Sequence, residues 1–303
     1  MATLTVIFFR TALLILPVIW SVALALGGVL STQIWSTASR VLWSHTWQVF
    51  LFGVVTYLLL SEEERDARGH LVVLATLMSW AYFVRPTSSI PIAAISVYML
   101  IFRPKEFVAY ALTGAIWSVG FITYSWTTFG TVLPGYYMFH LSSQHLAEAF
   151  AGDLVSPSRG LFVYVPSTLF VLALVAYYWR TLPQRRLAVV SLRIIPVHLF
   201  VVSMDTNWWG GHCYGSRLCT DIVPWFFLLA VLAMRCLVDE DRPRLKQFAV
   251  VLGLVTLVAG AFTNGRGAIS QVANNWVNVP VNVDQDPRRV WDWSDPHFLA
   301  GLH

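Results

Sequence analysis

The chain has 303 residues, of which 57% are hydrophobic and only 12% are charged, and its formal net charge at pH 7 is +4. Soluble domains carry about 25% charged residues, so this composition excludes an ordinary soluble globular protein. The basic residues stand singly between apolar runs rather than in one stripe, which argues against nucleic-acid binding.

The apolar runs follow one another along the chain and predict an all-α, polytopic transmembrane helical bundle. A helix that spans a bilayer needs about 20 mostly apolar residues. We expect about nine spans by this criterion: Leu4–Val29, Thr46–Leu60, Leu71–Val84, Ser88–Phe102, Phe107–Thr127, Gly160–Trp179, Leu187–Met204, Asp221–Val238 and Gln247–Phe262.

The third and fourth of these runs are short and are separated by Arg85-Pro86-Thr87. A single continuous span would place the Arg85 charge near the bilayer centre, which is costly. Pro86 also disfavours a helical conformation at the residue before it. We therefore predict a hairpin of two short helices that meet near one membrane face.

The distribution of Lys and Arg predicts the orientation, because cytoplasmic loops carry an excess of both. The connections assigned to the inside contain most of them: Arg65, Arg68, Arg103, Lys105, Arg180, Arg185, Arg186, Arg242, Arg244 and Lys246. The outward connections contain fewer: Arg40, Arg85, Arg159 and Arg217. This pattern predicts an N-terminus on the inside of the membrane. We assign residues 1–263 to the transmembrane domain and 264–303 to a short outward polar tail.

The outward segments are longer and rich in Trp, Tyr, Gly and Ser, and such loops commonly carry function. Their arginines are candidate phosphate ligands because a guanidinium presents a fork of donors: Arg85, Arg159 and Arg217. Aromatic rings that could stack on a sugar, with glycines that permit close backbone approach, are candidate substrate-binding residues: Tyr136, Trp209, Gly210, Gly211 and Tyr214.

Structural interpretations compete with each of these assignments. A single Arg at the end of a span is commonly a snorkelling anchor for lipid head groups. The Trp–Gly cluster is also consistent with a tight turn, and Asp221 is interpreted as a helix cap. The outward histidines have no metal-ligand spacing, so we assign them structural or solvated roles and predict no metal and no cofactor.

Several patterns follow one another, each once, between about Ser31 and Val238. In chain order they are the run Ser31–His45; Val84-Arg85-Pro86-Thr87; Tyr124 with Phe129-Gly130 and Gly135-Tyr136; Ser156–Leu161 with Pro166; and Trp209-Gly210-Gly211 with Tyr214-Gly215 and Arg217. This ordered set resembles the polyprenyl-phosphate-dependent glycosyltransferases of the GT-C superfamily. It is most similar to bacterial relatives of the protein O-mannosyltransferases and of the lipid A aminoarabinose transferase.

The resemblance implies a glycosyltransferase that moves a hexose or pentose from a polyprenyl phosphate carrier to an acceptor on the non-cytoplasmic face. The three arginines would hold the leaving phosphate, and a carboxylate in the first outward loop would activate the acceptor hydroxyl. That loop, Ser31–His45, contains no Asp or Glu. The resemblance therefore implies that the first two spans and the catalytic loop are missing, which leaves Asp153 and Asp205 as weak catalytic candidates.

The implied partners are the polyprenyl phosphate sugar, membrane lipid and a membrane protein that supplies the missing spans. Two alternatives stay open: a non-enzymatic protein that binds or moves a lipid-linked sugar, and a structural subunit of a membrane complex. Co-purification of a small membrane protein would favour the subunit. Ion transport is disfavoured, because the centres of the predicted spans are almost free of ionisable residues.

Overall fold

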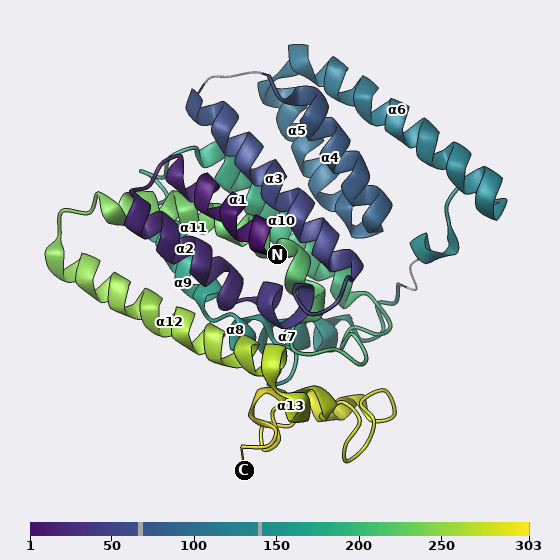
Figure 1. Cartoon of the computed structure of the whole chain (residues 1–303), viewed down its shortest axis with the longest axis vertical. Helices are drawn as coiled ribbons and strands as arrows, with labels where there is room; N and C mark the ends of the chain where they lie inside the picture. Colours follow the sequence, from purple (N-terminus) through teal and green to yellow (C-terminus); the bar gives the residue numbers. More distant parts are fainter. Residues whose placement is uncertain (66–68, 139–140, 303) are drawn as a thin grey trace.

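The computed structural model describes residues 1–65, 69–138 and 141–302 and consists of helices joined by loops (Figure 1). The α-helices are α1 (Ala2–Leu13), α2 (Val18–Leu30), α3 (Ser44–Arg65), α4 (Leu71–Val84), α5 (Ser89–Phe102), α6 (Pro104–Phe129), α7 (Leu146–Val155), α8 (Leu161–Tyr164), α9 (Ser167–Tyr177), α10 (Arg185–Ser203), α11 (Val223–Val238), α12 (Pro243–Ile269) and α13 (Gln271–Asn275). Shorter helical turns are η1 (Ile34–Ala38), η2 (Pro86–Ser88), η3 (Gly135–Tyr137), η4 (Arg217–Ile222), η5 (Pro287–Trp291) and η6 (His297–Leu299). No strand forms within the described ranges, and Arg68 lies outside them.

Four helical segments are long and apolar enough to cross a membrane. They are Pro104–Phe129, Arg185–Ser203, Arg217–Val238 and Pro243–Ile269, and several shorter apolar helices accompany them. The all-helical prediction is confirmed, whereas the structure does not confirm about nine spans.

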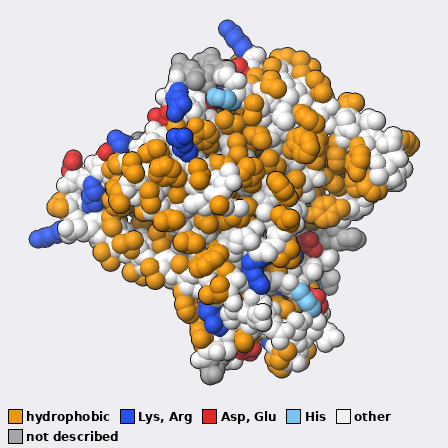
Figure 2. All heavy atoms as spheres, in the orientation of Figure 1, with side chains coloured by type: hydrophobic (Ala, Val, Ile, Leu, Met, Phe, Trp, Pro, Cys, Tyr) orange, Lys and Arg blue, Asp and Glu red, His pale blue; other side chains and the backbone are white. Residues whose placement is uncertain are grey.

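The outer surface of the bundle is apolar, as Figure 2 shows for one face. Only 6% of the most apolar stretch of α6 and 17% of that of α12 are buried within the protein. Side chains such as Ile116 and Val258 are 72% and 68% exposed. A continuous apolar surface of this kind is unusual on a monomeric soluble protein. Membrane lipid is the solvent that matches it, and the fold is compatible with an integral membrane protein.

The hairpin predicted around Arg85 is present, with α4 and α5 joined through η2. At the turn, the Gln48 side-chain amide donates to the hydroxyls of Thr87 and Ser88 at 3.3 and 2.9 Å. At the end of the hairpin opposite to the turn, the Glu62 carboxylate contacts both helices. It accepts from the backbone N–H of His70, which precedes α4, and from Arg103, which follows α5. The turn and the helix ends therefore lie at opposite ends of α3.

The first apolar run is a second hairpin, so the prediction of one span over Leu4–Val29 is wrong. It breaks at Pro17, which lacks an N–H and precedes α2. The two helices pack side by side, since a Cβ on Gly28 would lie 3.2 Å from the Phe8 ring. The α1–α2 turn lies beside α11, where Arg235 donates to the Ile15 carbonyl at 3.4 Å.

Two further boundaries differ from the prediction. The run Gly160–Trp179 is divided at Pro166 into α8 and α9, for the same reason as the break at Pro17. Helix α12 continues past the predicted boundary at residue 264 and ends at Ile269. It continues because Asn264 is buried there and donates to the Tyr164 carbonyl at 2.8 Å.

The connections gather at two ends of the bundle. The charged end consists of 61–65, 103–106, 178–186 and 239–242, which are linked by contacts such as Gln184 to Glu64 and Tyr178 to Glu240. The loop end consists of 31–45, 85–88, 130–138, 141–160, 205–221 and 264–302, linked by contacts such as Gln33 to Ser216. These two groups match the predicted inward and outward segments.

The structure does not show on which side of a membrane the N-terminus lies. Helices α1 and α2 are antiparallel, so the α1–α2 turn lies toward the charged end and Met1 lies on the opposite side of that turn. The prediction for Met1 counted α1 and α2 as one span, and the structure contains two short helices there.

Candidate functional site

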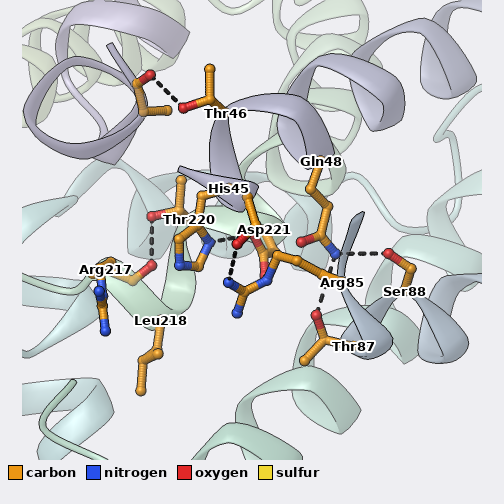
Figure 3. A network of polar contacts seen from close by, with 12 residues as sticks. His45, Thr46, Gln48, Arg85, Thr87, Ser88, Arg217, Leu218, Thr220 and Asp221 are labelled. Atoms are coloured by element: carbon orange, nitrogen blue, oxygen red, sulfur yellow. Dashed lines mark hydrogen bonds and ion pairs between the residues drawn. The ribbon is translucent and has the colours of Figure 1, made fainter. Parts of the chain in front are cut away.

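A buried carboxylate, Asp221, is the centre of a polar network at the loop end (Figure 3). Asp221 lies in η4, directly before the apolar helix α11, and its side chain is 1% exposed. Its Oδ1 lies 2.6 Å from His45 Nδ1, and its Oδ2 lies 3.2 Å from Arg85 Nε. A buried carboxylate needs such partners, because an unpaired charge in a low-dielectric interior is strongly unfavourable.

The three members of this network come from distant parts of the sequence. His45 begins α3, Arg85 follows α4 at the hairpin turn, and Asp221 precedes α11. The interpretation of Asp221 as a helix cap is wrong, since η4 and α11 show no side-chain cap hydrogen bond. The carboxylate instead holds the guanidinium of Arg85 in one orientation.

Arg85 also connects the network to the protein surface. Its Nη1 donates to the Ser44 hydroxyl at 2.9 Å, and its side chain is 13% exposed. The Ser44 hydroxyl lies 3.5 Å from the phenol oxygen of Tyr136, which is 60% exposed. Tyr136 therefore lies at the outer rim of the site, one hydroxyl away from the Arg85 guanidinium.

A second arginine, Arg217, borders the same network. In Figure 3, the His45 ring lies between the Arg217 side chain and the Asp221 carboxylate. The Arg217 guanidinium stacks 4.3 Å from the Trp43 ring centroid, and its Nη2 donates to the Gly210 carbonyl at 2.8 Å. Its Nε is buried and has no hydrogen-bond acceptor among the described residues. One guanidinium group, that of Arg85, thus pairs with the buried carboxylate, and the other, that of Arg217, stacks on the Trp43 ring.

Arg159, the third predicted phosphate ligand, lies elsewhere in the loop end and is 2% exposed. Its Nε donates to the Trp209 carbonyl at 2.5 Å, and its two Nη atoms donate to the carbonyls of Ser158 and Gly211 at 2.8 and 3.2 Å. Its Nη1 also lies 3.1 Å from His297 Nδ1. These donors orient loop backbone, so Arg159 acts in the structure as an internal anchor.

The loop 207–216 owes its shape to glycine. Gly210 and Gly211 have φ angles of +73° and +61°, which side-chain-bearing residues rarely adopt. This conformation lets the Gly210 carbonyl accept from Arg217 while the Gly211 carbonyl accepts from Arg159. Trp209 is partly buried, and its indole N–H donates to Asp284 of the C-terminal segment at 2.8 Å.

The C-terminal segment packs on the same loop. A small apolar cluster joins it to α7 and to the loop: Ala149, Trp208, Trp276, Val277, Val283, Val290 and Ala300. Tyr214, a predicted substrate-binding residue, is buried beneath it and donates to the Thr263 carbonyl at 2.7 Å. His297 stacks on Trp276, and burial together with the Arg159 charge holds its pKa well below the usual range.

The two catalytic candidates have different environments. Asp153, on α7, is 2% exposed and accepts from the Ser203 hydroxyl at 2.7 Å. Burial raises the pKa of its carboxyl to about 7. Asp205 is half-buried, and its Oδ1 accepts from the backbone N–H of Asn207 at 2.8 Å, which closes a turn. Neither carboxylate contacts Arg85 or Arg217 among the described residues.

The structure thus brings Arg85, Arg217 and Tyr136 to one site. Arg159, Tyr214 and the Trp209–Gly211 loop lie next to this site and make internal contacts that hold the loop end together. Sequence reasoning missed His45 and Asp221 as site residues. A signal was present, since Asp221 follows Arg217 by four residues at the start of an apolar run. Its partners His45 and Arg85 are too far away in the sequence for spacing to identify.

No group of three or more His, Cys, Asp or Glu residues that could hold a metal ion occurs in the described ranges. Comparison with known proteins matches the chain to no family model, no curated protein and no solved structure. The function therefore has to be argued from the geometry of the loop end and the membrane-compatible fold.

Proposed function

We propose that the loop end binds the phosphate of a polyprenyl phosphate sugar and that the protein transfers the sugar to an acceptor at the non-cytoplasmic face. The observation that carries this proposal is the pair of arginines, Arg85 and Arg217, beside the buried His45–Asp221 pair. Both retain guanidinium nitrogens that no described hydrogen bond uses. Guanidinium groups with free donors suit a phosphate ester.

The chemistry is a substitution at the anomeric carbon of the sugar. The acceptor hydroxyl oxygen forms the new glycosidic bond, the bond between the anomeric carbon and the phosphate oxygen breaks, and the polyprenyl phosphate leaves with the bonding electron pair. Preorganised positive charge at the leaving group stabilises the transition state. Asp221 and His45 are positioning residues in this scheme, because they hold Arg85 and do not touch the substrate.

A carboxylate has to take the proton of the acceptor hydroxyl. Asp153 is our candidate for this role, because burial raises the pKa of its carboxyl to about 7, close to the operating pH; since the side chain is 2% exposed, α7 has to move for it to reach an acceptor. Tyr136 and Trp43 at the rim are the candidates for stacking against a sugar ring.

The second candidate function is non-enzymatic binding of a lipid-linked sugar. It is favoured by the position of the Asp221 carboxylate, which is buried and ion-paired with His45 and Arg85, and by the lack of an Asp or Glu in the segment Ser31–His45. A protein of this kind, or a subunit whose partner supplies the catalytic carboxylate, would bind the donor without transferring the sugar.

The first experiment measures both binding and transfer by the full chain in nanodiscs. Native mass spectrometry reports binding of undecaprenyl phosphate, and release of labelled sugar from a polyprenyl phosphate hexose or aminopentose reports transfer. We expect Arg85→Gln and Arg217→Gln each to weaken phosphate binding by about tenfold, since a hydrogen bond to a charged group contributes about 1.5 kcal/mol. Arg288→Gln is the matched control, because Arg288 is exposed on the same end.

Each result has one meaning. Binding that the two site variants leave unchanged would overturn the phosphate site. Binding without transfer, with Asp153→Asn indistinguishable from the parent, would replace the transferase by the binding protein.

We also propose that the charged end faces the cytoplasm of a bacterial cell, because it carries the larger share of Lys and Arg.

A further inference from the structure

A lateral groove opens between α5 and α10 on the side of the bundle. It has a volume of about 1000 Å³, at the upper end of the range for ligand pockets. Its walls are apolar and exposed, with Val97, Ile101 and Val197 between 48% and 62% exposed. Both helices run between the charged end and the loop end, so the groove follows the direction in which a lipid chain would lie.

The groove becomes basic toward the charged end. Arg185, Arg186 and Arg193 line it on α10, and all three are exposed. Arg193 follows Arg186 by seven residues, so both lie on the same face of the helix. The described residues include one acid in its lining, Glu63, and the Glu63 carboxylate is already bonded to Tyr98 and Arg103.

Nothing in the described part of the protein neutralises these arginines, since no ion pair of Arg185, Arg186 or Arg193 is found there. Arg193 lies within a segment apolar enough to span a membrane, where an unpaired charge is costly. The first turn of α10 has no acidic residue and begins with two arginines, which oppose the positive end of the helix dipole. An anion at this position would relieve both costs.

One arginine is already oriented for such an anion. The Arg186 guanidinium lies 4.6 Å from the centroid of the Phe102 ring, which belongs to the opposite wall of the groove. A cation stacked on an aromatic face is held across the groove while its N–H edges stay free.

We propose that an anionic phospholipid docks in this groove, with its phosphate between Arg186 and Arg193 and an acyl chain against the apolar walls. Charge complementarity selects an anionic lipid over a zwitterionic one, because the basic lining exceeds the acidic lining and a zwitterionic head group brings no net charge. The site lies at the end opposite to the Asp221 network and does not depend on the proposed sugar transfer.

The test is native mass spectrometry of the purified full chain, titrated with phosphatidylglycerol or with phosphatidylcholine of identical acyl chains. We expect a tightly retained phosphatidylglycerol and no equivalent phosphatidylcholine. The double variant Arg186→Gln/Arg193→Gln should lose the preference by about tenfold or more. The matched control is Arg180→Gln/Arg244→Gln, which removes two exposed arginines at the same end that do not line the groove.

A second variant tests the apolar part of the site. Ala93 is exposed on α5 and lines the groove, so Ala93→Trp should fill it and reduce phosphatidylglycerol binding while every arginine is retained. The proposal is overturned if the two lipids bind equally to the parent protein, if the Arg186→Gln/Arg193→Gln variant keeps the preference, or if Ala93→Trp binds phosphatidylglycerol as the parent does. Dimerisation through this face in place of lipid binding would also overturn it.

Discussion

At the scale of single residues, Asp221 has the largest consequence for the site, because its carboxylate is buried against both His45 and Arg85. The sequence identified Arg85 and Arg217 as candidate ligands from their position near the ends of apolar runs. It gave no reason to pair Arg85 with Asp221, since 135 intervening residues separate the two positions. The pairing arises only when the α4–α5 turn and η4 meet at the loop end.

Replacing Asp221 by Asn should destabilise the protein by about 3–5 kcal/mol, because it leaves the mostly buried Arg85 charge without its partner. Adding Arg85→Gln should restore part of the loss, with a coupling of about 1 kcal/mol or more between the two sites. Thermal unfolding in detergent measures all three variants. Additive effects within about 0.5 kcal/mol would contradict the pairing. Asp205→Asn serves as the control, because an Asn amide oxygen at this position can still accept from the Asn207 N–H.

The pH dependence of stability should report on Asp153. Burial raises the pKa of its carboxyl from 3.8 to about 7, so the folded protein binds more protons than the unfolded chain between these values. Stability therefore falls as the pH rises through this window. The Asp153→Asn variant lacks this titration, and its melting temperature should fall less than that of the parent between pH 5 and pH 8. Parallel curves for the two proteins would show that Asp153 is not held in a protonated state.

At the scale of elements, proline explains both the success and the failures of the predicted spans. Arg85-Pro86 was interpreted as a helix boundary because a continuous span would bury a charge, and the α4–α5 hairpin is present. No charged residue adjoins Pro17 or Pro166, so apolar length favoured one span in each case. The structure breaks both runs, because proline lacks the N–H that a continuous helix needs.

The packing of Tyr214, in the loop 207–216, against α12 can be tested by a Gly→Ala substitution, which adds one methyl group. A Cβ on Gly267 would lie 2.2 Å from a carbon of the Tyr214 ring, whereas a Cβ on Gly114 of α6 would meet nothing within 4 Å. We expect Gly267→Ala to destabilise the protein by about 1–3 kcal/mol through overpacking. Gly114→Ala should stabilise it by about 0.5–1 kcal/mol through the unfolded chain. Equal melting temperatures for the two variants would mean that the loop does not pack on α12 as described.

At the scale of the whole molecule, the connections divide into a charged end and a loop end, and these ends are expected to face opposite sides of a membrane. A membrane-impermeant maleimide can test this on intact cells in a background of Cys213→Ser, Cys219→Ser and Cys236→Ser. The exposed Gln285→Cys at the loop end should react from outside. The exposed Asp241→Cys at the charged end should react only after permeabilisation. Labelling of Asp241→Cys on intact cells would reverse the proposed orientation, and labelling of both variants would contradict the separation of the two ends.

The sequence by itself determined the class of fold and the grouping of the loops. Apolar runs of helical length, interrupted by short charged connections on one side and aromatic connections on the other, need only local composition to be recognised. The tertiary structure decided the division of the first apolar run into α1 and α2, the roles of Arg159 and Tyr214 as internal anchors, and the assembly of His45, Arg85 and Asp221. These features depend on contacts between residues far apart in the chain, and such contacts are set by how the helices pack rather than by the spacing of residues along the sequence.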